Sequence, residues 1–126
     1  MGVSIIAERD TAMPTLRILT NVTVAPDARQ ALLARASSAV AEMLGKPESY
    51  VMVVLEEGRD IVFGGSFDPA AYLELKSLGL PEDRTPDFSR VLCELMSELL
   101  AVPPGRVYIE FASPPRHLFG WNSGTF

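Results

Sequence analysis

The chain has 126 residues, of which 48% are hydrophobic and 21% are charged, a balance that excludes a disordered chain and fits one globular domain. The net charge of -5 argues against nucleic acid or an anionic membrane surface as a partner, because both need clustered cations. Cys93 is the only cysteine, so no intrachain disulfide can form. No stretch approaches the ~20 apolar residues of a membrane span, and residues 1–12 lack the pattern of a signal peptide. We therefore expect a cytoplasmic protein, with leaderless secretion as an alternative.

Hydrophobic periodicity divides the chain into short strands and two helices. In chain order we expect a strand at 15–22, a helix from 26 to 44, a strand at 50–55, a hairpin return at 61–63, a strand at 71–78, a helix from 85 and a strand at 107–111. Apolar residues at spacings of three and four mark the first helix, namely Leu33, Ala36, Val40, Met43 and Leu44. Gly45 stands where its left-handed C-terminal cap belongs. Thr85 is a suitable N-cap for the second helix, with Pro86 in the first turn.

The chain also repeats itself at an offset of 56 residues. Without a gap, 15–22 falls on 71–78, and 51–55 then falls on 107–111. Each half is therefore a strand, a helix and a parallel strand, and such crossovers are almost always right-handed. We predict an α+β (α/β) domain in which a doubled βαβ unit forms a four-stranded mixed sheet with both helices on one face. The open face favours an oligomer built through sheet faces and edges, and a monomeric α+β sandwich is the alternative.

Residue content excludes several kinds of active site. His117 and Cys93 are the only soft metal ligands, and zinc sites use three or four ligands, so we expect no metal and no cofactor. The same histidine would have to serve any Ser-His-Asp triad, and the chain has no nucleophile elbow, Walker loop or dinucleotide-binding glycine motif. Glu56 and Glu57 point to opposite faces of a strand, so we interpret them as two solvated charges without a role.

Three features remain: Pro14 at the head of the first strand, Lys46 just past a helix with Tyr50 close behind, and the aromatic tail at 119–126. The second and third also have structural interpretations, because a cation is favourable at a helix C-terminus and an aromatic tail can anchor a chain end. Pro14 carries chemistry only at a terminus, where it is a secondary amine, whereas an internal proline is an amide. Translation from Met13, followed by removal of the methionine, would expose that amine.

Together these segments resemble the family of macrophage migration inhibitory factor and D-dopachrome tautomerase, in the superfamily of tautomerases that use an amino-terminal proline. The resemblance covers 13–126. Its landmarks are Met13-Pro14, Gly45-Lys46-Pro47 with Tyr50, Phe63-Gly64-Gly65-Ser66, Asp68-Pro69, Lys76-Ser77-Leu78-Gly79, Arg106-Val107-Tyr108-Ile109, Gly120-Trp121-Asn122 and Thr125-Phe126. The family's fold, a doubled βαβ protomer assembled as a homotrimer, agrees with the architecture expected from the repeat.

The resemblance implies keto-enol tautomerisation of phenylpyruvate-like α-keto acids and, as a further activity, isomerisation of dopachrome-like compounds. Pro14 would be the general base, with a pKa lowered by an apolar pocket and a nearby cation. Lys46 and the backbone at Leu78 would hold the substrate carboxylate. The apolar walls would be Tyr50, Leu78, Phe119, Trp121 and Phe126, and Tyr108 would reach the pocket from an adjacent subunit.

The chain departs from the family at three places. Glu110 stands where macrophage migration inhibitory factor has an amide, which bears on the substrates accepted. The family's Cys-x-x-Cys segment corresponds to 70–73 here, which holds no cysteine, so no thiol oxidoreductase activity is expected. Residues 1–12 form an extension or an upstream start ahead of the tautomerase domain at 13–126. The alternative function is a non-catalytic, cytokine-like binding module whose pocket this extension blocks, and the sequence leaves receptor binding open.

Overall fold

The computed structural model describes residues 13–126, so the extension predicted at 1–12 lies outside the described residues. The strands and helices are β1 Thr15–Thr20, α2 Arg29–Leu44, β2 Met52–Glu56, β3 Ala71–Lys76, α3 Thr85–Leu100, β4 Val107–Ala112, β5 Gly120–Trp121 and β6 Gly124–Thr125. Each predicted strand and helix of the doubled repeat is present, with ends shifted by a few residues. The expected Ile61–Phe63 strand is absent.

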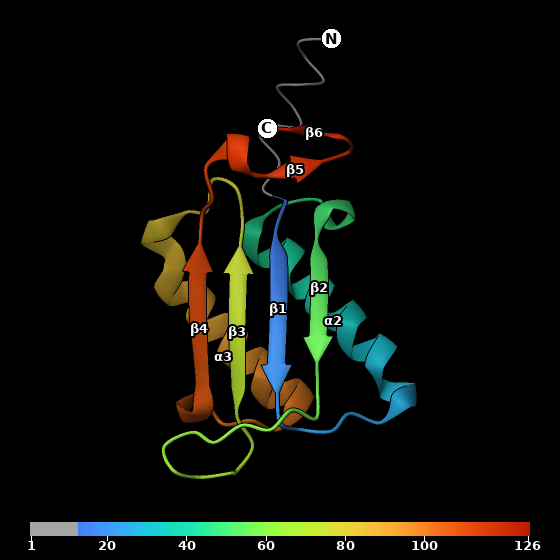
Figure 1. The fold of residues 1–126 in the computed structure, drawn as a ribbon, viewed down its shortest axis with the longest axis vertical. Coiled ribbons are helices and arrows are strands. Elements are labelled where there is room, and N and C mark those ends of the chain that lie inside the picture. The colour runs from blue at the N-terminus through green and yellow to red at the C-terminus, as the bar shows by residue number, and fades with distance from the viewer. Residues whose placement is uncertain (1–12) are drawn as a thin grey trace.

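The four long strands form one mixed sheet in the order β2-β1-β3-β4 (Figure 1). Strands β1 and β2 run parallel, as do β3 and β4, and the two pairs meet where β1 lies antiparallel to β3. Each parallel pair is joined through one helix, as the internal repeat predicts. One end of the sheet therefore holds the starts of β1 and β2 and the ends of β3 and β4, and this arrangement positions the candidate site.

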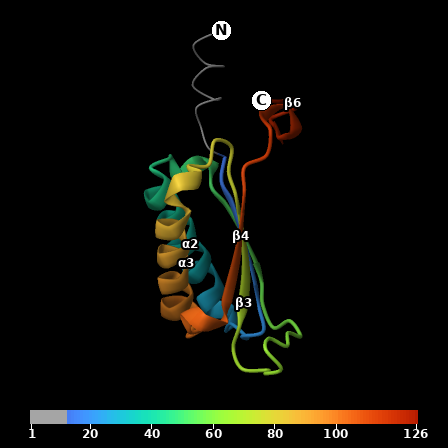
Figure 2. The same cartoon turned by 90° about the vertical axis from the view of Figure 1, so that its left-hand side faces the viewer.

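Both helices cover the same face of the sheet, and the other face is open (Figure 2). Along β1, Leu16, Ile18 and Thr20 are fully buried while the residues between them are only partly buried, which is the period-2 alternation of a sheet covered on one side. Helix α3 places Phe88 and Met96 in this core. In α2, Leu32 is buried, whereas Leu33, which the sequence predicts on the buried face, is only partly buried.

The two helices end alike but with different residues. Gly45, at the end of α2, has φ 63°, and the equivalent Ala101, at the end of α3, has φ 55°. Both lie in the left-handed region, where glycine is free of the Cβ clash and alanine is not. Thr85 is not the N-cap that the sequence predicts. It lies inside α3, and its hydroxyl donates to the carbonyl of Glu82 at 3.0 Å.

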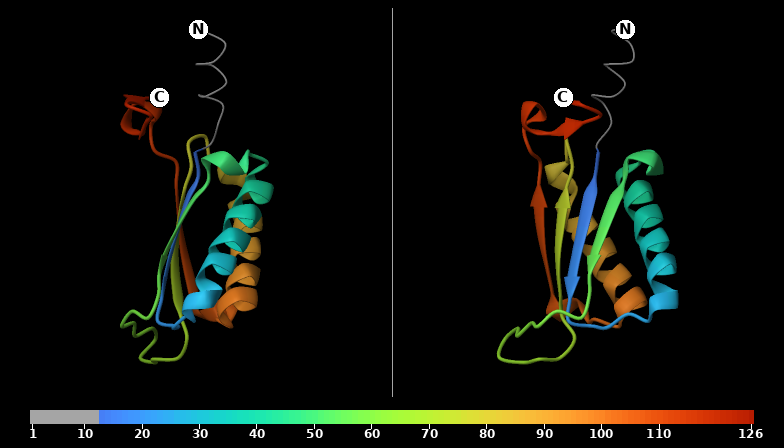
Figure 3. Two further views of the ribbon diagram at one scale, coloured as in Figure 1. Left: turned by 90° about the vertical axis from the view of Figure 1, so that its right-hand side faces the viewer. Right: turned by 45° about the vertical axis from the view of Figure 1, so that its right-hand side comes forward.

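The hairpin expected at Ile61–Phe63 is wrong, because its strand-forming residues belong to a long loop instead. The only pairing in this segment, among the described residues, is a bridge between Phe63 and Ser66. Strand β2 is an edge strand, and β1 occupies its inner side. The loop (residues 57–70) curls away from the helices at the end of the sheet opposite to the tail (Figure 3).

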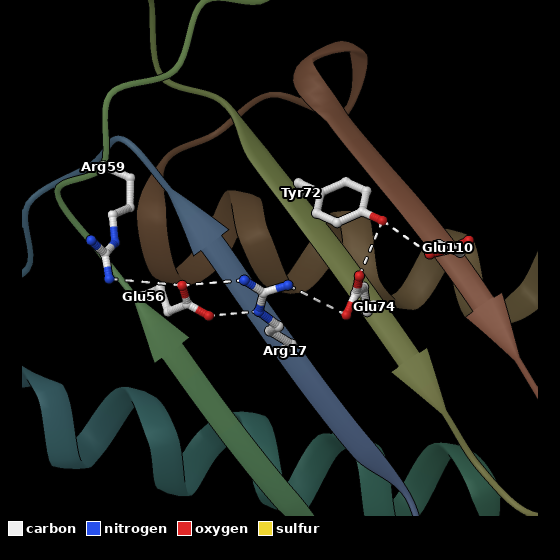
Figure 4. A network of polar contacts seen from close by, with 6 residues as sticks. All are labelled: Arg17, Glu56, Arg59, Tyr72, Glu74 and Glu110. Carbon is white, nitrogen blue, oxygen red and sulfur yellow. Dashed lines mark hydrogen bonds and ion pairs between the residues drawn. The ribbon is translucent and has the colours of Figure 1, made fainter.

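A chain of polar contacts crosses the open face of the sheet (Figure 4). Arg17 binds Glu56 with a shortest N–O distance of 2.6 Å and lies 3.6 Å from Glu74. The Tyr72 hydroxyl lies 3.0 Å from Glu110 and 3.3 Å from Glu74, so its single proton can serve only one of them at a time. The bond to Glu110 is the main cause of the raised pKa of Tyr72.

Glu56 and Glu57 do diverge, but describing them as solvated charges without a role is wrong. Glu56 pairs with Arg17, and this hydrogen bond is the main cause of its lowered pKa. Glu57 accepts the backbone N–H of Val24 at 3.0 Å and also binds Arg29. Both carboxylates therefore connect the end of β2 to other elements, which adjacency in sequence does not reveal.

Candidate active site

Pro14 lies buried at the head of β1. Its carbonyl accepts the N–H of Met52 at 2.9 Å, which joins it to the start of β2. Met13, the residue before it, is only 4% exposed and has φ 48°. A bulky residue before proline normally takes an extended conformation, so the Met13-Pro14 junction is held in an uncommon one. In the 126-residue chain the nitrogen of Pro14 is an amide.

Lys46 and Tyr50 reach the same end of the sheet through the connection from α2 to β2. The N–H of Lys46 donates to the carbonyl of Ala41 at 3.0 Å, completing the helix end that Gly45 begins. A short 3-10 turn, Glu48–Tyr50, then leads into β2. Lys46 is half-buried, so its side chain brings a cation to the end of the sheet where Pro14 lies.

The aromatic tail stands over this end of the sheet (Figure 1). Trp121 meets the ring of Tyr50 edge-on, with centroids 5.7 Å apart, and stacks on Phe126 at 6.2 Å. Phe119 packs against Phe126 at 6.2 Å, and the N–H of Phe126 donates to the carbonyl of Phe119. Trp121 is 39% exposed, so it is not a core anchor. The three tail aromatics therefore form one cluster with Tyr50, which joins it through Trp121.

Leu78 joins the same region from β3. Because β1 and β3 are antiparallel, Thr15 lies opposite Lys76, and the chain beyond Lys76 continues toward the head of β1. Leu78 is 2% exposed, and the N–H of Ser77 is bonded to the carbonyl of Ala112 on β4 at 3.0 Å. The structure therefore places Pro14, Lys46, Tyr50, Leu78 and the tail aromatics at one end of the sheet.

Tyr108 and Glu110 are not part of this cluster within the protomer. Tyr108 lies opposite Tyr72, which in turn lies opposite Leu19, five residues beyond Pro14 along β1. That separation is about 16 Å along the strand, with two strand spacings of about 4.8 Å across the sheet in addition. Both side chains are on the open face, and Tyr108 is 65% exposed. They can serve a Pro14 pocket only if that pocket belongs to another copy.

Other features of the described residues offer no competing centre. No group of three or more His, Cys, Asp and Glu residues between 13 and 126 is placed to hold a metal ion, and His117 is exposed. A hollow of about 520 Å³ lies beside the 57–70 loop, lined in part by Asn21, Arg59 and Phe67, but it is at the far end of the sheet from Pro14. None of the helices in this part of the chain is long and apolar enough to cross a membrane.

The fold and the candidate site together define the class of protein. It is a small α+β domain with a doubled βαβ unit, a buried proline at the head of its first strand and an aromatic tail. The model of the family described as macrophage migration inhibitory factor matches residues 13–126. The chain belongs to this family, whose members belong to the tautomerase superfamily.

Relatives support the assignment along the whole matched region. A macrophage migration inhibitory factor homologue of Brugia malayi is 38% identical over 115 residues, covering 90% of this chain and 99% of the relative. The crystal structure of a homologue from Prochlorococcus marinus matches with a TM-score of 0.83 and 41% identity, covering 89% of this chain and 98% of that one. The structure of the Trichinella spiralis protein matches with a TM-score of 0.82 and 34% identity, over 89% and 99% of the two chains.

Proposed function

We propose that this chain is a keto-enol tautomerase of aromatic α-keto acids such as phenylpyruvate, active in the form that begins at Pro14. The observation that carries the proposal is the burial of Pro14 at the end of the sheet that also receives Lys46 and the aromatic cluster of Tyr50 and Trp121. The start of the family match at Met13 supports a mature terminus at this point. Dopachrome-like compounds are a second substrate class for the same chemistry.

A free Pro14 would be a secondary amine that titrates near ~7.7 to 8.0 when unperturbed. Burial and a nearby cation both disfavour its charged form and lower its pKa, so more of it is neutral at pH 7. The neutral nitrogen takes the proton from the carbon beside the keto group. The electrons of the broken C–H bond form the C=C bond of the enolate, the carbonyl π electrons move onto oxygen, and the proton is then returned to that oxygen. No other reactant is consumed. Lys46 pairs with the substrate carboxylate, and the aromatic tail excludes water from the aromatic ring of the substrate.

The proposal requires an assembly of copies, because Tyr108 can reach a Pro14 pocket only from a neighbouring copy, and the resemblance to the family implies that this assembly is a homotrimer. The open face of the sheet supports such an assembly, since it presents Met52, Val54 and Tyr108 at exposures of 61%, 38% and 65%. Met52 and Val54 lie on one edge strand and Tyr108 on the opposite one, and exposed apolar side chains on an uncovered sheet face are typical of interaction surfaces. Light scattering at micromolar concentration should give three times the protomer mass, and a clean monomer would contradict this assembly.

The decisive experiment compares three forms of the chain, with the N-terminus of each determined by mass spectrometry. The full 126-residue form should not convert enol phenylpyruvate above the buffer rate. A chain translated from Met13, and shown to begin at Pro14, should do so. Pro14→Gly in the shorter chain should lower kcat/KM by about 10²- to 10⁴-fold, the usual contribution of general acid-base catalysis, while the exposed Pro81→Gly should not. No rate from the Pro14 form, or a rate untouched by Pro14→Gly, sinks the proposal.

A second candidate function is a non-catalytic binding module in which the residues before Pro14 block the pocket. The buried, left-handed Met13 favours it, because in the longer form this side chain is packed inward and Pro14 is acylated. The N-terminus of the protein isolated from its own cells decides between the two. A native chain that begins at Pro14 excludes the blocked form.

The cytoplasmic location expected from the sequence stays a prediction.

A further inference from the structure

The loop that replaces the expected hairpin is held by one arginine. Phe63 and Ser66 exchange both backbone hydrogen bonds across Gly64 and Gly65, whose φ values of 60° and 74° suit a type I′ turn. Arg106, just ahead of β4, donates to the carbonyl oxygens beyond and within this turn. These are Phe63 at 3.1 Å, Ser66 at 3.1 Å, Asp68 at 3.0 Å and Pro69 at 2.9 Å.

The same guanidinium also fixes a ring. Its central carbon lies 5.1 Å from the centroid of Phe63, within the range of a cation-π contact. Phe63 in turn packs on Tyr108, with centroids 4.7 Å apart and ring planes at 49°. Arg106 ends a short 3-10 turn, Pro104–Arg106, and Tyr108 is the second residue of β4, so the turn and the strand each bring one side chain to Phe63. Phe63 therefore contacts both the Arg106 guanidinium and the Tyr108 ring, and it links the two.

We propose that Arg106 is a positioning residue that acts through Phe63 to hold the Tyr108 ring ready for the pocket of a neighbouring copy. This inference deepens the proposed function, on which its kinetic part rests. Arginine suits the task because its planar fork spends four N–H bonds on loop carbonyls and still offers a flat face to the phenyl ring. Lysine has three donors on a single nitrogen and cannot do both.

The need for such a device follows from the exposure of Tyr108. Tyr108 is 65% exposed, so without the Phe63 contact its side chain would have most of its rotamer freedom, and ordering it at an interface or against a substrate would cost binding affinity. Holding the ring beforehand removes part of that cost. The saving corresponds to about three- to tenfold in KM for one ordered side chain. It should leave kcat nearly unchanged, because Pro14, and not Tyr108, carries the proton in the proposed reaction.

A double-mutant cycle on the chain translated from Met13, the length that its relatives share, separates this role from simple loop support. Arg106→Lys should raise KM for phenylpyruvate about three- to tenfold, with kcat within about twofold. On a Tyr108→Ala background the same change should have almost no further effect on KM, because coupled residues are non-additive. The control Arg90→Lys removes an arginine fork from an exposed α3 ion pair and should change neither constant. Additive KM effects, or a wild-type KM in Arg106→Lys, overturn the inference.

A second variant and a spectroscopic readout cover the case in which Arg106→Lys does not fold. Phe63→Leu keeps the arginine and the apolar loop but removes the intervening ring, and it should reproduce the rise in KM. With ¹³C-tyrosine in the full chain, which has 3 tyrosines, the Tyr108 resonance is identified by its loss in Tyr108→Phe. It should move in Phe63→Leu and in Arg106→Lys. An unmoved resonance in both variants overturns the inference. A moved resonance without turnover by wild type would remove the proposed function and leave the positioning intact.

Discussion

Thr20 offers a sharp test of how the end of β1 is held. Its side chain is fully buried. The hydroxyl donates to the carbonyl of Ala70 at 2.7 Å and accepts the N–H of Val22 at 3.1 Å. One hydroxyl thus satisfies two backbone groups where β1 ends and β3 begins. Thr20→Val keeps the shape and removes both bonds, whereas Thr20→Ser keeps both bonds and removes one methyl group.

The two substitutions should differ in the free energy of unfolding. A buried polar group left without a partner costs about 1 to 3 kcal/mol. Ala70 is 1% exposed, so its carbonyl cannot turn to water, and Thr20→Val should lose about 2 to 3 kcal/mol. Loss of one buried methyl costs about 1 kcal/mol, which is the expectation for Thr20→Ser.

Urea unfolding followed by far-ultraviolet circular dichroism measures both values, at one fixed protomer concentration because assembly contributes to apparent stability. The order should be wild type, then Thr20→Ser, then Thr20→Val, with unchanged denaturant slopes. If Thr20→Ser is as unstable as Thr20→Val, packing and not hydrogen bonding dominates at this position, and the reasoning from the two bonds is refuted.

Two further predictions concern helix ends and acid stability. Gly45→Ala should lower the free energy of unfolding by about 1 kcal/mol, and Ala101→Gly should raise it by about 0.5 to 1 kcal/mol. An alanine Cβ at position 45 meets no atom within 4 Å, so the expected loss comes from backbone strain alone. A Gly45→Ala variant as stable as the wild type would contradict the strain argument. The pKa of Glu57 is lowered from 4.5, first by the Val24 N–H and then by Arg29. Its stabilising contribution is therefore complete above pH 4.5 and is lost as pH falls through the lowered folded pKa. Glu57→Gln should weaken the protein at pH 7 and flatten the decline of the urea midpoint as the pH is lowered below 4.5. Parallel pH profiles of the two proteins would exclude this role.

The parts of the fold predicted correctly from the sequence depend on local signals. Apolar residues at spacings of three and four mark the first helix, and Gly45 marks its end. The offset repeat adds the topology, because two similar strand-helix-strand units have few ways to share one sheet. The hairpin failed for a complementary reason. The β-branched Ile61 and Val62 have a strand composition, but composition does not supply a neighbouring strand.

The candidate site divides in the same way. Pro14, Lys46 and Trp121 were singled out from the sequence, and the resemblance supplied their expected roles. The pairing of β1 with β2 brings the first two to one end of the sheet, and the ring contact with Tyr50 brings Trp121 there. The distance of Tyr108 from Pro14 within the protomer could not be read from spacing, because it depends on strand order. Arg106 and Phe63 were visible only as separate landmarks.

The strands and helices of the doubled repeat, their order, the single covered face of the sheet and the family could all be inferred from the sequence. Which distant residues meet could be learned only from the folded chain, as with Arg17 between Glu56 and Glu74 and Arg106 on the loop of Phe63. The physical reason is the range of the interactions. Caps, turns and periodicity act within a few residues, whereas cross-strand contacts join residues tens of positions apart and depend on a register in which a slip of one residue moves every side chain to the other face.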